Sequence, residues 1–262
     1  MSRSLPRVLD ADRLRDLALA HRASYAKALP FRHVVLDDFL PAPAAERILH
    51  EFPPPDTFRS ESSLKEPRRL GKRRSHSEEA FPPFLRRVLG ELCDDTFLDF
   101  VGTLSGIPDL LSDHDRAGAL RHYGRGSRLG IHADANFHAG LGAFRRVNLI
   151  LYLNRDWQAS YRGDLELWNE RLTGCQARIA PAFNRAVLFD VHDRAFHGFP
   201  DALRCPRGTT RKTIQLYYYT REPAEADARP HGTLFHWRDA DRWHPHRLWH
   251  AAYHTLRRRR SR

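Results

Sequence analysis

The sequence predicts a mainly β protein with flanking helices (an α+β arrangement), in which antiparallel strands form a sandwich or a barrel. Helical periodicity is confined to the N-terminal part, up to about residue 114. Five short runs rich in β-branched and aromatic residues follow, separated by Gly, Asn, Asp and Pro. Strands without long helices between them are typical of antiparallel sheets, so these runs are expected to pair directly with one another.

The N-terminal segment, residues 1–114, is expected to support the sheet. Asp10 is a good N-cap for a helix through "ADRLRDLALAHRASYAKAL", which Pro30 would end. "FRHVVLDDFL" predicts a strand, and "APAAERILHEF" predicts a short helix after it. Apolar residues at helical spacing over 81–104 predict one or two further helices.

Residues 56–80 are polar, charged and without periodicity, which predicts a mobile loop. Its position before the barrel suggests a lid that closes over a pocket and helps to select the substrate. The loop contains a basic cluster at 65–74, and a second basic cluster lies at 257–262. Both clusters are interpreted as exposed and solvated, with polyanion binding as the alternative.

The barrel itself is assigned to residues 115–222. The five strand runs are "ALRHYGRGSRLGIHAD", "RVNLILYLN", "DLELWN", "RAVLFDV" and "TIQLYYYT". Residues 223–262 form a His- and Trp-rich basic extension that is expected to pack on the barrel, so that the whole chain is one domain. In this extension His246, His250 and His254 would share one helix face; a packing helix is favoured over a second metal site.

Composition limits the class of protein. Hydrophobic residues make up 41% of the 262 residues, which argues against general disorder. No apolar run approaches the roughly 20 residues that span a bilayer, and the N-terminus lacks the apolar core of a secretory signal. Cys93, Cys175 and Cys205 form no C-x-x-C pair and suit a reducing compartment. A cytoplasmic protein without a membrane partner is expected; the sequence indicates no oligomeric state.

The stretch "LGIHADANFHAG" contains an H-x-D pair, His132 and Asp134. Alternate residues of a strand face the same side, so both side chains can bind one ion. A second such pair, His76-Ser77-Glu78, is set aside because no strand surrounds it. His138 is interpreted as a pocket wall or a loop hydrogen-bonding residue.

A third ligand must come from another strand. "FDVHDRAFHGFP" offers His192 and His197; His197 is favoured because it leads towards the next strand, and His192 stays the alternative. Two histidines and one carboxylate, with open coordination positions, form the facial triad of non-haem Fe(II) oxygenases. The sequence therefore predicts an iron site.

An iron site of this kind needs an anchor for an acidic cosubstrate. Arg211, at the start of "RKTIQLYYYT", can hold a carboxylate in a bidentate pair, whereas Lys212 alternates to the other face. Asn148 and Tyr152 share one strand face, and Asn148 is a candidate for the cavity wall. The three tyrosines at 217–219 are expected to pack within the barrel.

The stretch 123–220 resembles the iron- and 2-oxoglutarate-dependent dioxygenases, in particular their prolyl 4-hydroxylase-like branch. The matching pieces occur in order: "HYGRGSRLGIHAD", "VNLILYLNRDW", "GDLELW" and "FHGFPDALRCPRGTTRKTIQLYYYT". "DDFLPAPAAERILHEFP" also looks like the opening of that branch. The resemblance implies a double-stranded β-helix, or jelly-roll, barrel. One departure is Arg162 before Gly163, where the family often has two glycines.

The resemblance also implies the roles of the site residues. His132, Asp134 and His197 would be the catalytic iron ligands, and Arg211 would bind the distal carboxylate of 2-oxoglutarate. Tyr152 matches a tyrosine that often joins this contact, and Tyr123 matches an aromatic residue of the same pocket. The implied cofactors are Fe(II), 2-oxoglutarate as cosubstrate and O₂, with ascorbate as a candidate reductant.

The implied reaction is hydroxylation of an unactivated C–H bond, with succinate and CO₂ as co-products. The acceptor would be a prolyl residue in a protein or peptide, or another small polar molecule such as a free amino acid, a glycan or a natural product. A nucleic-acid demethylase is a less favoured alternative, because "RGTTRKT" lacks the R-x-N-x-T-x-R pattern. A non-catalytic jelly roll that senses or binds a ligand is the other alternative.

Overall fold

The computed structural model describes residues 6–61, 66, 68–224 and 229–238. The described residues contain four α-helices: α1 (Ala11–Lys27), α2 (Ala42–Glu51), α3 (Pro83–Glu91) and α4 (Asp95–Ser105). The strands are β1 (His33–Leu36), β2 (Arg59–Ser60), β3 (Arg69–Arg74), β4 (Leu111–Ser112), β5 (Leu120–Ala133), β6 (Phe137–His138), β7 (Ala143–Tyr152), β8 (Leu165–Trp168), β9 (Cys175–Ile179), β10 (Arg185–Asp190), β11 (His197–Phe199), β12 (Arg211–Thr220) and β13 (Leu234–Phe235).

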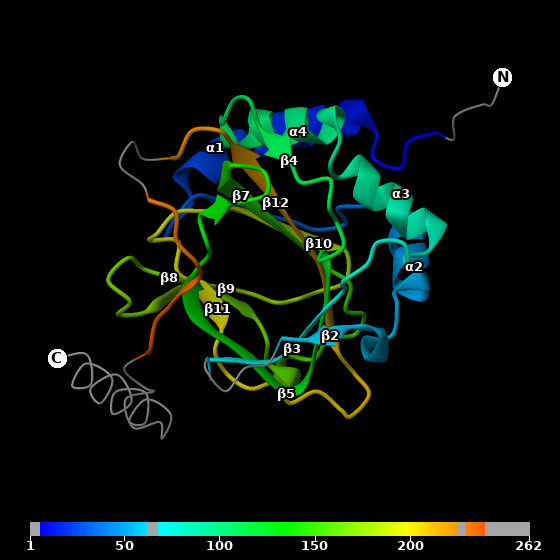
Figure 1. The fold of residues 1–262 in the computed structure, drawn as a ribbon, viewed down its shortest axis with the longest axis vertical. Helices are drawn as coiled ribbons and strands as arrows, with labels where there is room; N and C mark the ends of the chain where they lie inside the picture. The colour runs from blue at the N-terminus through cyan, green and yellow to red at the C-terminus, as the bar shows by residue number, and fades with distance from the viewer. Residues whose placement is uncertain (1–5, 62–65, 67, 225–228, 239–262) are drawn as a thin grey trace.

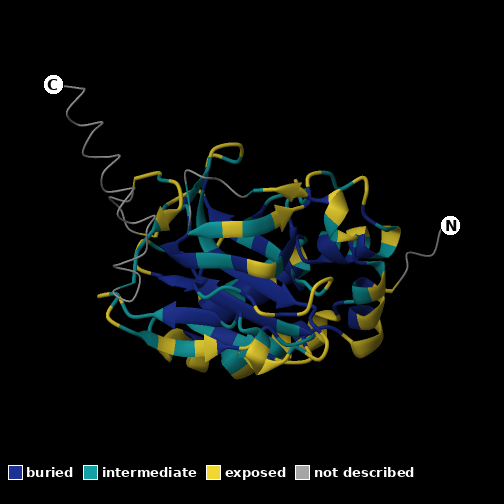
Figure 2. Ribbon diagram, turned by 90° about the horizontal axis from the view of Figure 1, so that it is seen from below, coloured by how far each residue is buried: buried dark blue, intermediate teal, exposed yellow. Residues whose placement is uncertain are grey.

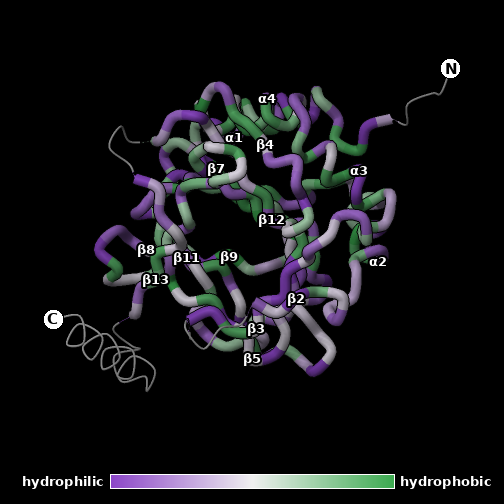
Figure 3. The backbone as a smooth tube through the Cα atoms, viewed as in Figure 1, coloured by the Kyte–Doolittle hydropathy of each residue, from purple (hydrophilic) through white to green (hydrophobic). Residues whose placement is uncertain are grey.

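The strands form one antiparallel sheet that curls into a nearly closed barrel. Its main path runs β1-β10-β7-β12-β5-β11-β8-β9. The strands surround the centre of the view in Figure 3, with α1 and α4 outside β7 and β12. β1 lies between α1 and α2, and β2 and β3 lie between α2 and α3, while the other strands follow the helices in the chain (Figure 1). This confirms the mainly β, jelly-roll fold with supporting N-terminal helices.

Alternation along the strands divides the core into two clusters. Leu149 and Leu151 of β7 face the helices, together with residues of β10 and β12. Ile150 and Tyr152 point into the barrel, where they join a second cluster with residues of β8, β9 and β10. Figure 2 shows the central strands buried and the exposed residues on the outer surfaces of helices and loops. One set of strands thus supplies both a core and an interior wall.

The predicted helix signals act as expected. Asp10 caps α1 by accepting a hydrogen bond from the Arg13 backbone N–H, and the helix ends at Lys27, before Pro30. Asp94 caps α4 in the same way, and Gly106 ends that helix with a left-handed φ of 72°.

The expectation of a loop over 56–80 is wrong for residues 59–60 and 69–74, which form β2 and β3. β3 pairs with the long strand β5. The pairing is made by the backbone, so the charged side chains of β3 leave no apolar alternation that could predict it. Lys72 is nevertheless half-buried and forms an ion pair with Glu61 at 2.9 Å.

The C-terminal extension reaches the barrel through β13, which pairs with β5. The predicted tail helix with His246, His250 and His254 lies outside the described residues, as does the basic cluster 257–262. Within the part of the chain that is described, no helix combines the length and apolar character needed to cross a bilayer.

A buried polar contact joins α1 to the barrel. The Tyr25 hydroxyl donates to Asp190 Oδ1 at 2.6 Å, and Arg32 Nε donates to Oδ2 of the same carboxylate at 2.6 Å. Burial raises the pKa of Tyr25, so its hydroxyl keeps its proton.

We predict that Tyr25→Phe lowers the free energy of unfolding by about 1.5–3 kcal/mol, because the buried Asp190 carboxylate loses a charge-assisted hydrogen bond. Tyr161→Phe is the control, since no described residue bonds its hydroxyl. Urea unfolding of both variants checks this; equal stabilities would contradict it.

Candidate metal centre

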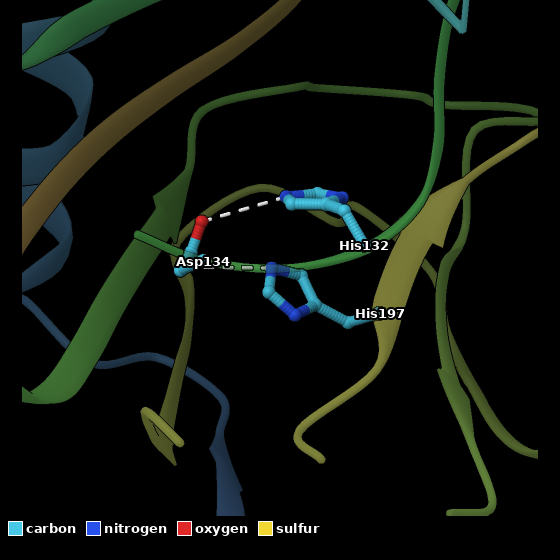
Figure 4. A group of neighbouring side chains, drawn as sticks. All are labelled: His132, Asp134 and His197. Carbon is cyan, nitrogen blue, oxygen red and sulfur yellow. Dashed lines mark ion pairs between the residues drawn. The ribbon is translucent and has the colours of Figure 1, made fainter. Parts of the chain in front are cut away.

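Three buried side chains that the sequence singled out, His132, Asp134 and His197, converge inside the barrel (Figure 4). His132 lies near the end of β5, directly opposite His197 of β11 in the strand pairing, and Asp134 follows β5. One donor atom from each lies within 4.8 Å of the others. His132 Nε2 is 3.4 Å from Asp134 Oδ1, and His197 Nε2 is 3.6 Å from Oδ2.

The hydrogen bonds of the two imidazoles fix their tautomers. His132 Nδ1 lies 2.8 Å from the Gly130 carbonyl, and His197 Nδ1 lies 2.9 Å from the Ala195 carbonyl. A carbonyl only accepts, so each Nδ1 carries the proton and donates it. Nε2 of each ring therefore faces the carboxylate, and in the neutral form of the ring its lone pair is directed as a divalent cation requires.

The charge states agree with this chemistry. Burial, together with the positive charge that His132 can carry, lowers the pKa of His197 to about 4, so His197 is neutral at pH 7. Burial alone would raise the pKa of Asp134, but His197 and His132 outweigh that effect and lower it. The donor set is thus two imidazole nitrogens and one carboxylate anion, which fits Fe(II).

A second layer of side chains orients the carboxylate. Asn148, which is fully buried, donates from Nδ2 to Asp134 Oδ2 at 2.8 Å. Gln215 Nε2 in turn donates to Asn148 Oδ1 at 3.2 Å. The Asn148 contact leaves the carboxylate with a fixed orientation towards the two imidazoles.

Arg211 lies on the same barrel interior and is 3% exposed. Its Nε donates to the Gly163 carbonyl at 2.9 Å, and its Nη2 donates to the Tyr152 hydroxyl at 3.1 Å. Tyr123 is its direct neighbour across the β5–β12 pairing. Among the described residues no carboxylate forms an ion pair with Arg211, so this buried guanidinium is suited to hold a carboxylate from outside the protein.

The backbone next to Arg211 depends on a glycine. Gly163 has a φ of 90°, and a Cβ there would lie 2.5 Å from Leu203 Cδ2 and 3.3 Å from Arg211 Cδ. Arg162 precedes this glycine and has a φ of 60°. It occupies the position at which the dioxygenases that the sequence resembles often have a first glycine.

The triad and Arg211 open into one cavity of about 360 Å³. Tyr123 lines it, as do Glu61, Lys72 and Arg74 from the 56–80 segment. A larger hollow of about 530 Å³ lies beside α4, but it is lined by Arg22, Asp95 and Asp99 and is distant from the triad's strands. The metal-ligating geometry, and not the volume, identifies the site.

The structure separates the remaining sequence candidates. His192 packs its ring against Phe31, with the ring centroids 6.1 Å apart, and is not brought to the triad. His138, at the end of the short strand β6, lies 3.3 Å from Asp113 through Nε2 and accepts a hydrogen bond from the Leu141 backbone N–H, so it is a hydrogen-bonding residue as predicted. Tyr218 donates to the Leu92 carbonyl in the core.

Tyr217 corrects the expectation that residues 217–219 only pack the barrel. It lines the cavity, and the Arg145 guanidinium lies 4.5 Å above its ring. Sequence reasoning also missed Phe235, whose ring lies 5.2 Å from that of His132. Phe235 reaches the site through the two-residue strand β13, which is too short to give a periodic signal.

Comparisons with known proteins agree with this geometry. Residues 118–219 match the sequence model of the 2OG-Fe(II) oxygenase superfamily. No curated protein sequence matches the chain significantly. Similar solved structures include a prolyl hydroxylase from Trichoplax adhaerens in complex with a hypoxia inducible factor peptide fragment (TM-score 0.58, 16% identity, 82% of this chain and 94% of that chain). A Pseudomonas putida prolyl-4-hydroxylase has a TM-score of 0.56 at 18% identity, covering 78% of this chain and 100% of that chain.

We predict that Asn148→Ala weakens the binding of Co(II) by about 10–100-fold, because Asp134 loses the contact that orients it. Asn169→Ala is the matched control, since Asn169 bonds within an exposed turn. Anaerobic calorimetry measures the two affinities. An Asn148→Ala protein that binds Co(II) as tightly as the control would show that this contact is dispensable.

Proposed function

We propose that this protein is a 2-oxoglutarate-dependent dioxygenase that hydroxylates a prolyl residue or another small polar acceptor. The match of residues 118–219 to the 2OG-Fe(II) oxygenase sequence model and the likeness of the fold to a prolyl hydroxylase support the proposal. Succinate and CO₂ are the co-products. One observation carries the proposal: the triad lines the same cavity as Arg211, which forms no ion pair with any described carboxylate.

In this proposal His132, Asp134 and His197 hold Fe(II). Their three donor atoms leave coordination positions open. Once bound, the iron supplies the redox chemistry of O₂ and 2-oxoglutarate. The chain's own contribution is to keep the Nε2 lone pairs of both histidines aimed at one point, through the Nδ1 hydrogen bonds to Gly130 and Ala195.

Arg211 binds the distal carboxylate of 2-oxoglutarate, and the Tyr152 hydroxyl completes the contact. Burial raises the pKa of Tyr152 above its ordinary value, so the hydroxyl remains protonated and can donate. Burial likewise raises the pKa of Tyr123 to about 12. These groups exclude water around a charge pair, which strengthens the pair and orients the cosubstrate along the cavity.

The acceptor must reach the iron through a confined space. The cavity volume of about 360 Å³ is near the lower end of the roughly 300–1,000 Å³ of ligand pockets. With 2-oxoglutarate inside, the remaining space suits one side chain or a small molecule. The prolyl hydroxylase from Trichoplax adhaerens that binds a peptide supports a peptide acceptor as one form of this proposal.

We predict that Asp134→Ala abolishes the visible charge-transfer band that forms when Fe(II) and 2-oxoglutarate are added to the wild type without O₂. Succinate formation after O₂ is admitted should fall to background, because two neutral imidazoles alone hold iron poorly. Asp193→Ala, in an exposed surface ion pair, is the control. A wild type without band or succinate would refute the proposed function.

We predict that Arg211→Gln raises the Kd for 2-oxoglutarate by about 100-fold, since a bidentate charge pair in a buried site is lost. Metal binding should persist, because Arg211 contacts none of the three ligands. Arg207→Gln removes the same charge from an exposed position and should leave the Kd unchanged. Calorimetry with Mn(II)-loaded protein measures both values.

A further inference from the structure

We propose that the cavity contains a second oxyanion subsite, formed by Arg121 and Arg145, which binds a carboxylate or phosphate group of the substrate. The inference rests on the proposed function, because it assigns the substrate class of the same site. It favours a small acidic acceptor over a neutral prolyl residue.

The first argument is the balance of charge around the cavity. Six basic side chains line it: Arg69, Lys72, Arg74, Arg121, Arg145 and Arg211. The acidic side chains that line it are Glu61 and Asp134. Glu61 pairs with both Lys72 and Arg74, at 2.9 and 2.8 Å. Since Fe(II) and the 2-oxoglutarate dianion cancel each other, they leave this positive excess in place.

The second argument is that two of the basic groups have no direct ion pair; Glu61 and Asp134 act on Arg121 and Arg145 only at longer range. Within the described ranges, neither Arg121 nor Arg145 forms an ion pair. Arg121 is only 6% exposed, and its Nε has no hydrogen-bond partner. The Nε of Arg145 is also buried and without a partner. A guanidinium held largely away from water without a direct ion pair is costly, so these groups point to an anion from outside the chain.

Backbone carbonyls hold both guanidinium groups in place. Arg121 Nη1 donates to the carbonyls of Gly118 and Ala119, at 2.8 and 3.3 Å. Arg145 Nη1 donates to the Ala135 carbonyl at 2.9 Å, while the group lies over the Tyr217 ring. Arg145 also forms a hydrogen bond with the Tyr219 side chain. These contacts hold both groups in place, while the Nε of each has no hydrogen-bond partner among the described residues and can donate to a ligand.

The subsite is separate from the 2-oxoglutarate clamp. Tyr123 pairs with Arg211 across β5 and β12, whereas Arg121 pairs with Thr213, two residues further along both strands. Two residues of strand correspond to roughly 7 Å. Arg145 lies further still, opposite Tyr219. One anion at Arg211 and another at Arg121 and Arg145 can therefore bind at the same time.

The subsite also lies on a path to the surface. A neighbouring hollow of about 410 Å³ shares five lining residues with the iron cavity: Arg74, Arg121, Arg145, Gln215 and Tyr217. An acid bound there would place its charged group between the two hollows, with its uncharged part free to extend towards the triad. A neutral prolyl side chain would leave both arginines without a partner.

The test is a calorimetric titration of protein loaded with Mn(II) and 2-oxoglutarate. The probes are inorganic phosphate, acetate and the neutral analogue acetamide. We expect phosphate or acetate to bind wild type, and the tighter of the two identifies the preferred oxyanion. The affinity should fall at least 10-fold in Arg121→Gln and in Arg145→Gln, and remain unchanged in Arg207→Gln. Arg121→Lys keeps the charge but cannot donate two parallel hydrogen bonds, so its oxyanion affinity should lie between those of wild type and Arg121→Gln.

The outcomes separate this inference from the proposed function. A wild type that binds 2-oxoglutarate but neither oxyanion would overturn the subsite alone, as would equal binding of acetamide. Oxyanion affinities that stay unchanged in both Arg121→Gln and Arg145→Gln would also overturn it. A wild type that fails to bind 2-oxoglutarate at the first step would instead count against the proposed function.

Discussion

The burial of the Asp134 carboxylate is the constraint on which the rest of the site depends. A carboxylate in the barrel interior is costly unless hydrogen bonds and an opposite charge compensate for it. Asn148 provides a hydrogen bond, and the two nearest imidazoles use Nδ1 for backbone carbonyls, so that their Nε2 atoms face the carboxylate. A divalent cation bound between these three groups would supply the opposite charge, and the pairing of β5 with β11 places the two histidines for it.

Because alternate residues of a strand face opposite sides, the same strands supply the hydrophobic core on one face and line the candidate metal centre on the other. On β7, Leu149 and Leu151 pack against the helices, while Ile150 and Tyr152 face inwards. The helical layer buries the outer apolar face, so that the inner face can carry polar groups without loss of a core. Helices α1 and α4 therefore stabilise the barrel from its outer face, while the metal-binding side chains lie on its inner face.

Much of this arrangement was predictable because it depends on short-range patterns. His132 and Asp134 share a strand face, and the strand runs are rich in β-branched and aromatic residues, so their positions follow from period two. β3 could not be predicted, because its pairing is made by the backbone beneath charged side chains. Arg145 lies next to a register shift between β7 and β12, and such a bulge changes which residues face inwards.

The excess positive charge in the cavity also bears on how two acids would be told apart. A cluster of basic groups attracts every small anion, so charge alone cannot direct 2-oxoglutarate to Arg211 and a substrate to Arg121. The positions of the side chains can distinguish the two acids, because an anion bound at Arg211 also meets the hydroxyl of Tyr152, which the guanidinium already contacts. An acid that cannot also bind the metal gains less binding free energy at Arg211. Geometry therefore separates the two anions, while the shared field concentrates both of them in one cavity.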